Sequence, residues 1–142
     1  MILGFELEKI NVERKGRPMG NVKVKHNLNI DSVTERTLTA LGKRKSLDIR
    51  FTFTVSYEPS LGNITIIGNV LYSDNDAKLA NVMEHWKSKK KVIREASIEV
   101  VNSILARCNI KSLQLAEDLN LPYHMPLPKF ESPKSAYENY IG

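Results

Sequence analysis

The chain has 142 residues, one cysteine and a net charge of +5, and 42% of its residues are hydrophobic. This length predicts a single domain, residues 1–142, with a core large enough to fold without disulfides. One cysteine excludes an internal disulfide, and the lack of any run of about 18 apolar residues argues against a membrane span. Charges start at Glu6 with no apolar signal core before them, so we expect a cytoplasmic protein.

The first half of the chain alternates apolar and polar residues, as a strand with one buried face does. Residues 21–30 and 47–57 show this pattern most clearly. Residues 5–12 contain two phases that a bulge near Lys9 would reconcile. Residues 63–72 are apolar in both phases, which favours burial on both faces or a subunit contact. Because burial of one face is typical of antiparallel sheets, the four segments predict one four-stranded antiparallel sheet.

Glycine and proline mark connections between these strands at residues 15–20 and 58–63. A longer basic segment, residues 35–46, lies between the second and third expected strands. It has two interpretations, a fraying strand end or a crossover loop.

The second half changes to helical periodicity. Asp74 is the expected N-cap, and apolar residues recur at helical spacing from Leu79 to Cys108, with a through helix or a kink at residues 87–91. A short helix is expected at residues 113–119, before prolines stop it. Strands followed by helices predict the α+β class, in which a long C-terminal helix and a short second helix cover one face of the sheet.

An apolar, proline-rich segment at residues 121–130, here termed the strap, follows the last expected helix. Pro122, Pro126 and Pro128 exclude a helix, although the residues between them are as apolar as a core. The strap either covers the end of the core or presents its side chains for binding, since a chain stiffened by proline loses little entropy on ordering. The polar tail, residues 131–142, is expected to be loosely held.

No pattern in the sequence predicts catalysis or a metal site. His26, His85 and His124 lack partners at metal-ligand spacing, and His26 is expected in the interior because it shares the apolar phase of its strand. Cys108 continues an apolar helix stripe, so we expect a buried, inert thiol. Phosphate-binding loops and nucleophile elbows do not occur. We therefore expect no enzyme, no cofactor and no metal.

Basic runs at residues 13–17, 42–45 and 87–91 make nucleic acid a candidate partner. Aromatic residues do not interleave with them as they do in proteins that bind single strands. Solvated surface charge is therefore the favoured interpretation, and nucleic-acid binding is the rival.

The order of four strands, long helix, short helix and strap resembles the SecB-like chaperone family, including its archaeal relatives. The most specific part is LQLAEDLNLPYHMPLPKF, residues 113–130, which is similar to the helix end and proline-rich stretch of those relatives. The resemblance implies a dimer or a dimer of dimers, with the long helices sandwiched between sheets. It also implies an ATP-independent activity that holds unfolded or extended polypeptides in apolar grooves.

The peptide-binding candidates are Tyr123, Met125, Leu127 and Phe130 in the strap, because tyrosine and methionine bury area against many partner shapes. Trp86 is a weaker candidate, since its helical spacing suits the core. Bacterial export members of the family are acidic whereas this chain is basic, so the resemblance implies holding activity and not delivery to a translocation motor. Two alternatives remain, a nucleic-acid-binding protein that uses its basic loops and a structural oligomeric domain without chaperone activity.

Overall fold

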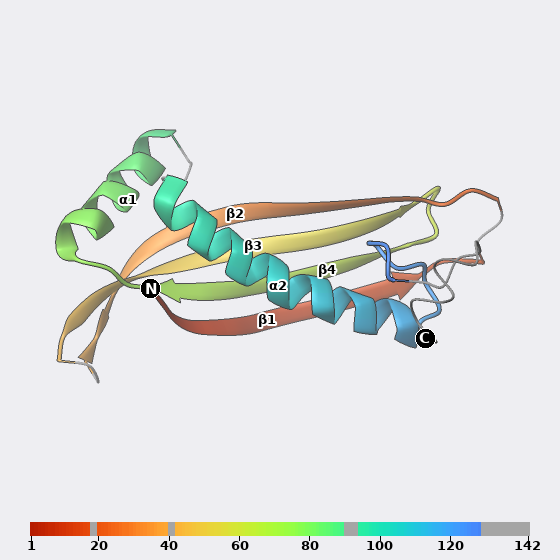
Figure 1. Ribbon diagram of the computed structural model, residues 1–142, viewed down its shortest axis with the longest axis horizontal. Helices are drawn as coiled ribbons and strands as arrows, with labels where there is room; N and C mark the ends of the chain where they lie inside the picture. Colours follow the sequence, from red (N-terminus) through yellow and green to blue (C-terminus); the bar gives the residue numbers. More distant parts are fainter. Residues whose placement is uncertain (18–19, 40–41, 90–93, 129–142) are drawn as a thin grey trace, which may run out of the picture.

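The described residues form four strands followed by two helices, in the order of element types that the sequence predicts. A computed structural model of the protein describes residues 1–17, 20–39, 42–89 and 94–128. The elements in chain order are β1 (Ile2–Arg14), β2 (Lys23–Leu38), β3 (Arg44–Glu58), β4 (Gly62–Tyr72), α1 (Asp76–Lys89) and α2 (Arg94–Asp118) (Figure 1). The α+β class and the antiparallel sheet expected from the sequence are confirmed.

The sheet has the strand order β1-β4-β3-β2, so the first two strands lie at its opposite edges. The chain between β1 and β2 therefore crosses from one edge to the other. Both interpretations of residues 35–46 were wrong, because β2 and β3 continue to pair there as far as Leu38 and Arg44. This hairpin turns at Gly42 and Lys43, which have φ angles of 74° and 57°.

Bulges in the two edge strands decide which of their side chains face the core. The register of β1 shifts between Leu7 and Lys9, which confirms the bulge expected near Lys9. The register of β2 shifts between Ile30 and Ser32, and the shift brings Val33 into the buried face. This second bulge interrupts the alternation that begins at residue 21. It explains why the sequence pattern predicted only the first half of β2.

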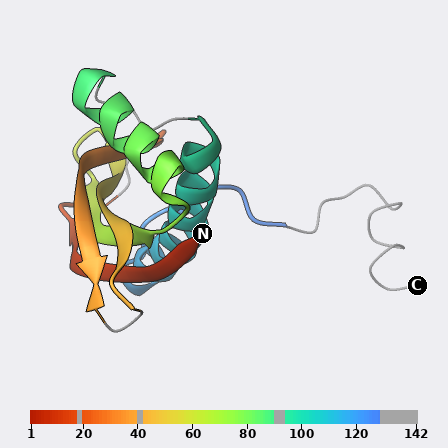
Figure 2. The ribbon, with the colours of Figure 1, turned by 90° about the vertical axis from the view of Figure 1, so that its left-hand side faces the viewer.

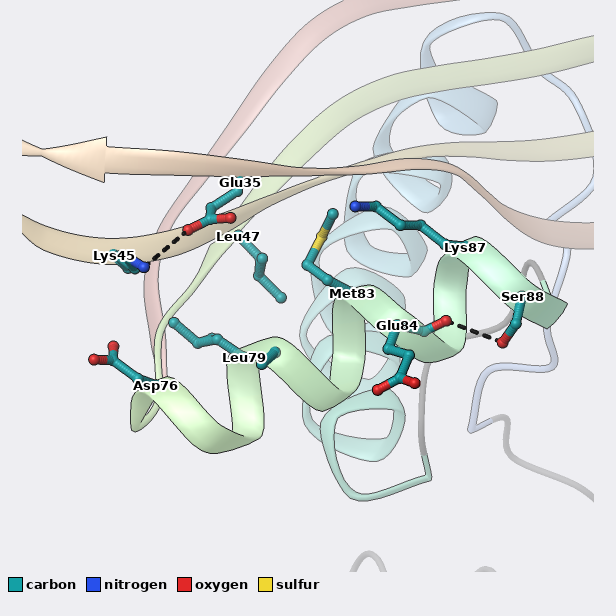
Figure 3. Close-up of a pocket in the computed structure, with 10 residues that line it drawn as sticks. Glu35, Lys45, Leu47, Asp76, Leu79, Met83, Glu84, Lys87 and Ser88 are labelled. Atoms are coloured by element: carbon teal, nitrogen blue, oxygen red, sulfur yellow. Dashed lines mark hydrogen bonds and ion pairs between the residues drawn. The ribbon is translucent and has the colours of Figure 1, made fainter.

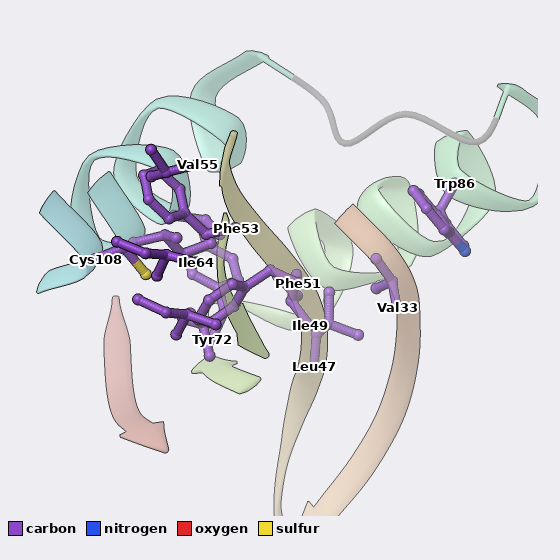
Figure 4. Close-up of a cluster of buried hydrophobic side chains, with 14 of the residues drawn as sticks. Val33, Leu47, Ile49, Phe51, Phe53, Val55, Ile64, Tyr72, Trp86 and Cys108 are labelled. Carbon is purple, nitrogen blue, oxygen red and sulfur yellow. The ribbon is translucent and has the colours of Figure 1, made fainter. Parts of the chain in front are cut away.

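One face of β3 and β4 supplies most of the core. The buried side chains of this face come from one phase of each strand: Leu47, Ile49, Phe51, Phe53, Val55, Tyr57, Ile64, Ile66, Val70 and Tyr72 (Figure 4). The second apolar phase predicted for β4 points to the other face, where Ile67 and Leu71 are half-buried among polar neighbours. The sheet therefore has one dry face and one open face.

Both helices cover the dry face of the sheet, as Figure 2 shows from the end. Helix α2 packs on β4 and β1, and α1 packs at one end of β2 and β3. The N-cap of α1 is Asn75 and not the expected Asp74, because the Asn75 side-chain oxygen accepts from the Lys78 amide at 2.9 Å. Asp74 instead accepts from Tyr72 and from the Asn75 amide.

The helix boundaries differ from the sequence prediction. The helix expected from Asn75 to Cys108 is two helices, and the long one is the second, α2, with 25 residues or about 37 Å. The short helix expected at residues 113–119 is the last part of α2. A kink at residues 87–91 was one of two expectations; residues 90–91 of that segment and the polar tail at 131–142 lie outside the described residues.

Candidate functional site

The strap begins at a specific helix stop at the end of α2. Asn120 adopts a φ angle of 55°, and its amide donates to the carbonyl of Glu117. The Leu121 amide then donates to the carbonyl of Ala116 at 2.8 Å. This pair of bonds is the Schellman motif, in which asparagine can replace the usual glycine. The helix therefore ends before Pro122, and the chain turns back onto the sheet.

Two side chains fix the first part of the strap to the body of the protein. Leu121 belongs to the core cluster and is 5% exposed. His124 is 8% exposed, and its Nε2 atom lies 2.8 Å from the Asn109 side-chain oxygen on α2. The His124 ring also packs edge-on against Phe53 of β3, with ring centroids 6.3 Å apart. Residues 121–124 thus cover the dry face at the end of the sheet that α1 does not reach (Figure 1).

Burial changes the protonation chemistry of His124. Desolvation of the ring lowers the pKa of His124 below its ordinary value, and the neighbouring His26 of β2 lowers it further. The two imidazole rings meet edge to face with centroids 5.8 Å apart. The expectation that His26 lies in the interior was wrong, because β2 is an edge strand and His26 is exposed at its margin.

Beyond its anchor, the strap presents apolar side chains to solvent. Met125 and Leu127 are 38% and 45% exposed, and Tyr123, between the two anchoring residues, is 42% exposed. Pro126 and Pro128 stiffen the exposed part. The structure therefore brings three of the predicted contact residues together on one short surface segment. Phe130 lies outside the described residues.

Trp86 is separate from this group. It lies on α1, at the other end of the sheet from the strap (Figure 1), and its side chain is 9% exposed beside Val33 in the core cluster (Figure 4). The helical spacing of Trp86 had already favoured a place in the core, which made it the weaker candidate for peptide binding. A contact between Trp86 and a bound polypeptide would need α1 to move.

A groove between α1 and the β2–β3 hairpin was not predicted from the sequence. It encloses about 580 Å³, and Leu47, Leu79 and Met83 point into it (Figure 3). Its rim carries both charges, including an ion pair of Lys45 with Glu35 at 3.6 Å. Because α1 and two strands contribute its lining, no local pattern could reveal it; the only available signal was the spacing of Leu79 and Met83 on one helix face.

A second apolar surface lies where α2 crosses the edge strand β1. A hollow of about 270 Å³ there is lined by Phe5, Leu7 and Ile110, among others. Ile110 and Leu7 are 61% and 39% exposed. The Arg107 guanidinium lies 4.7 Å from the centre of the Phe5 ring, a cation–π contact that holds one wall of the hollow.

The described residues contain a buried thiol and no cluster of potential metal ligands. Cys108 is buried on the inner face of α2, and burial raises the pKa of its thiol to about 12, so the thiol stays protonated. No three His, Cys, Asp or Glu side chains of residues 1–17, 20–39, 42–89 and 94–128 gather as metal ligands. None of the helices in these ranges is long and apolar enough to cross a membrane.

The basic runs at residues 13–17 and 42–45 do not form one patch. Residues 13–17 lie at the strap end of the sheet and residues 42–45 lie at the tip of the β2–β3 hairpin, at the opposite end (Figure 1). Arg14 donates to the carbonyls of Gly16 and Leu119, and Lys45 pairs with Glu35. The described part of the third run, Lys87 and Lys89, lies on α1, and Lys87 lines the groove beside α1 together with Lys45. A nucleic-acid surface requires clustered cationic groups, and the runs at 13–17 and 42–45 lie too far apart to form one cluster.

Comparison with solved structures shows which fold this is. The chain superposes on a SecB-like chaperone of Mycobacterium tuberculosis, solved in complex with a ChAD peptide from an antitoxin, with a TM-score of 0.56. The match covers 94% of this chain and 91% of the chaperone, at 8% sequence identity. The fold is SecB-like. At this identity the SecB-like match establishes architecture alone, and neither the family models nor the curated proteins gave a match.

Proposed function

We propose that the protein holds extended or unfolded polypeptide segments without nucleotide, as an ATP-independent chaperone. The observation that carries the proposal is the division of the strap into a buried anchor and an exposed part. Leu121 and His124 fix the segment, while Tyr123, Met125 and Leu127 face solvent. Because the strap is already ordered before a client binds, binding costs little further entropy of the strap. Its exposed apolar side chains can then contact clients of many sequences. The peptide bound to the SecB-like structural neighbour supports this proposal.

The test is suppression of client aggregation, followed by light scattering, with and without a double substitution in the strap. Met125→Asp/Leu127→Asp introduces two carboxylates into the exposed part and leaves the anchor intact. The matched control is Asn81→Asp/Asn102→Asp, which makes the same change in charge at exposed polar positions on α1 and α2. Circular dichroism must first show all three proteins equally folded.

We expect wild type and the control to suppress aggregation, and the strap variant to lose most of this activity. If wild type never suppresses aggregation of any client, the chaperone proposal fails and a structural role is left. Equal suppression by the strap variant would move the binding site elsewhere, first to the groove beside α1. Tight, salt-steep binding of mixed RNA and DNA in a parallel assay would favour the nucleic-acid alternative.

We also propose that the protein self-associates into a dimer or tetramer through β1 and α2. Both edge strands carry charged side chains, which protect an edge: β2 has Lys23, Lys25, Glu35 and Arg36, and β1 has Glu6, Glu8, Lys9 and Glu13. The β1 edge differs because it also exposes Leu7 and Ile10, and Leu7 lines the same hollow as Ile110 of α2. An antiparallel β1 edge is self-complementary, so a second copy can pair with it around a two-fold axis.

The oligomer is tested by light scattering across a concentration series. We expect a species larger than the monomer, and Ile110→Asp should shift it toward the monomer because a carboxylate in the interface would be buried without a partner. Glu117→Gln, an exposed change further along α2, is the control and should leave the mass unchanged. A strict monomer at high micromolar concentration would contradict this proposal.

A further inference from the structure

The anchor of the strap depends on the charge state of one imidazole. In the neutral ring, the Nε2–H of His124 donates to the Asn109 side-chain oxygen at 2.8 Å. The Nδ1 atom is buried and has no hydrogen-bond partner among the described residues. The neutral ring therefore has one satisfied donor and one unsatisfied acceptor.

Protonation would make this site much less favourable. It would add a second N–H on Nδ1, where no acceptor is in place, and a positive charge in a buried position. The groups facing the ring do not compensate: β3 contributes the apolar ring of Phe53, α2 contributes the uncharged amide of Asn109, and β2 contributes His26. Cys108, adjacent to Asn109, is a neutral thiol because its pKa is raised to about 12. His26 is the one titratable group that the described residues place against the ring, and its charge opposes protonation.

Two other buried polar atoms lie on the elements that hold the anchor. Besides His124 Nδ1, the buried side-chain atoms without a partner in the described residues are the Tyr57 hydroxyl and the Ser112 hydroxyl. Tyr57 follows Phe53 by four residues on the same face of β3, and Ser112 lies one helical turn after Asn109. These two residues share a strand with Phe53 and a helix with Asn109, which are the residues that the His124 ring contacts.

We propose that protonation of His124 releases the strap from the sheet and uncovers the apolar surface around Phe53 and Leu121, so that mild acid enlarges the polypeptide-binding surface. The purpose of the release rests on the proposed chaperone function, but the release itself does not. Burial lowers the pKa of His124 from 6.5 in the docked state, so the free strap binds more protons than the docked strap. Docking is therefore fully favoured above about pH 6.5 and is lost progressively below it.

Backbone hydrogen exchange across residues 119–128 measures the release without any client. The Leu121 amide is the reporter, because it donates to the Ala116 carbonyl when the strap is docked. After correction for the intrinsic pH dependence of exchange, we expect its protection to be constant from about pH 7.5 to 6.5 and to fall from about pH 6.5 to 5.5, by up to about tenfold per pH unit for one proton. Amides of β3 and β4 should keep their protection and serve as internal controls.

Two substitutions decide whether His124 is the cause. Asn109→Asp places a carboxylate at the Nε2 atom, which favours the protonated ring, so this variant should keep its protection in acid. His124→Gln removes the titration and should give protection that does not depend on pH. Constant protection of wild type across this range would overturn the proposal, as would release of Asn109→Asp in acid at the same pH as wild type. If His124→Gln fails to dock at any pH, Asn109→Asp still decides. Because no client is present, loss of chaperone activity and loss of strap release are independent results.

Discussion

Gly68 of β4 is a position where one added methyl group should harm the sheet. It pairs with Leu7 of β1 at the bulge and with Phe51 of β3 on the other side. A Cβ atom at Gly68 would lie 2.4 Å from the Glu6 carbonyl oxygen and 2.9 Å from the Phe51 ring. The ring cannot retreat because it is fully buried, and the carbonyl belongs to the backbone of the bulge. In Gly68→Ala, β1 must therefore move outward.

The magnitude follows from these two contacts. Overpacking of a filled core destabilises by about 1–3 kcal/mol, and the gain from replacing glycine in the unfolded chain offsets about 0.4–1 kcal/mol. We expect a net loss of about 1.3 kcal/mol in the free energy of unfolding. With a urea m-value of about 2 kcal/mol/M, the midpoint should fall by about 0.6 M. The assay is urea unfolding followed by circular dichroism at one fixed protein concentration.

Gly4→Ala is the matched control in the same pair of strands. A Cβ atom at Gly4 would meet only the Leu71 side chain at 3.7 Å, an ordinary contact. The free energy of unfolding of Gly4→Ala should stay within about 0.5 kcal/mol of the wild-type value. Equal effects of the two alanines would refute the reasoning, because only Gly68 has the close approach of the bulge.

Two further changes test local details of the structure. Asn75→Ala removes the N-cap of α1 and should lower the free energy of unfolding by about 1 kcal/mol. We expect the melting temperature to fall by about 3–5 °C. An unchanged melting temperature would mean that the Lys78 amide finds another partner. Cys108, with its pKa raised to about 12 and 1% exposure, should resist thiol reagents at about pH 8 in the native state and react fully in denaturant; rapid labelling of the native protein would show that α2 opens.

The sequence was informative wherever a local pattern decides the structure. The single phase of β3 fixed its buried face in advance, and the phase change in residues 5–12 located the bulge at Lys9. The helix cap was missed by one residue because Asp74 and Asn75 are both good caps, and Tyr72, from outside the helix, takes the Asp74 carboxylate. Local chemistry could not make this choice.

Features that depend on distant contacts were not predictable. His26 has the apolar phase of β2, but exposure at an edge strand depends on what covers it, and here the His124 ring of the strap lies against one edge of His26. The strap was recognised as an unusual segment, yet its division into anchor and exposed part follows from the turn at Asn120 and the contact with Asn109. The groove beside α1 needs Glu35, Lys45 and Met83 from three elements, so it emerges only on folding.

The central claim is that the exposed part of the strap binds extended apolar polypeptide, and the most direct measurement is the dissociation constant of a labelled apolar peptide without nucleotide. Fluorescence anisotropy at about pH 7.5 keeps His124 neutral and the strap docked. Burial of the exposed parts of Met125 and Leu127 is worth about 1–2 kcal/mol, so Met125→Asp/Leu127→Asp should weaken binding by about tenfold or more, while Asn81→Asp/Asn102→Asp should not. The same dissociation constant for wild type and the strap variant would contradict the account.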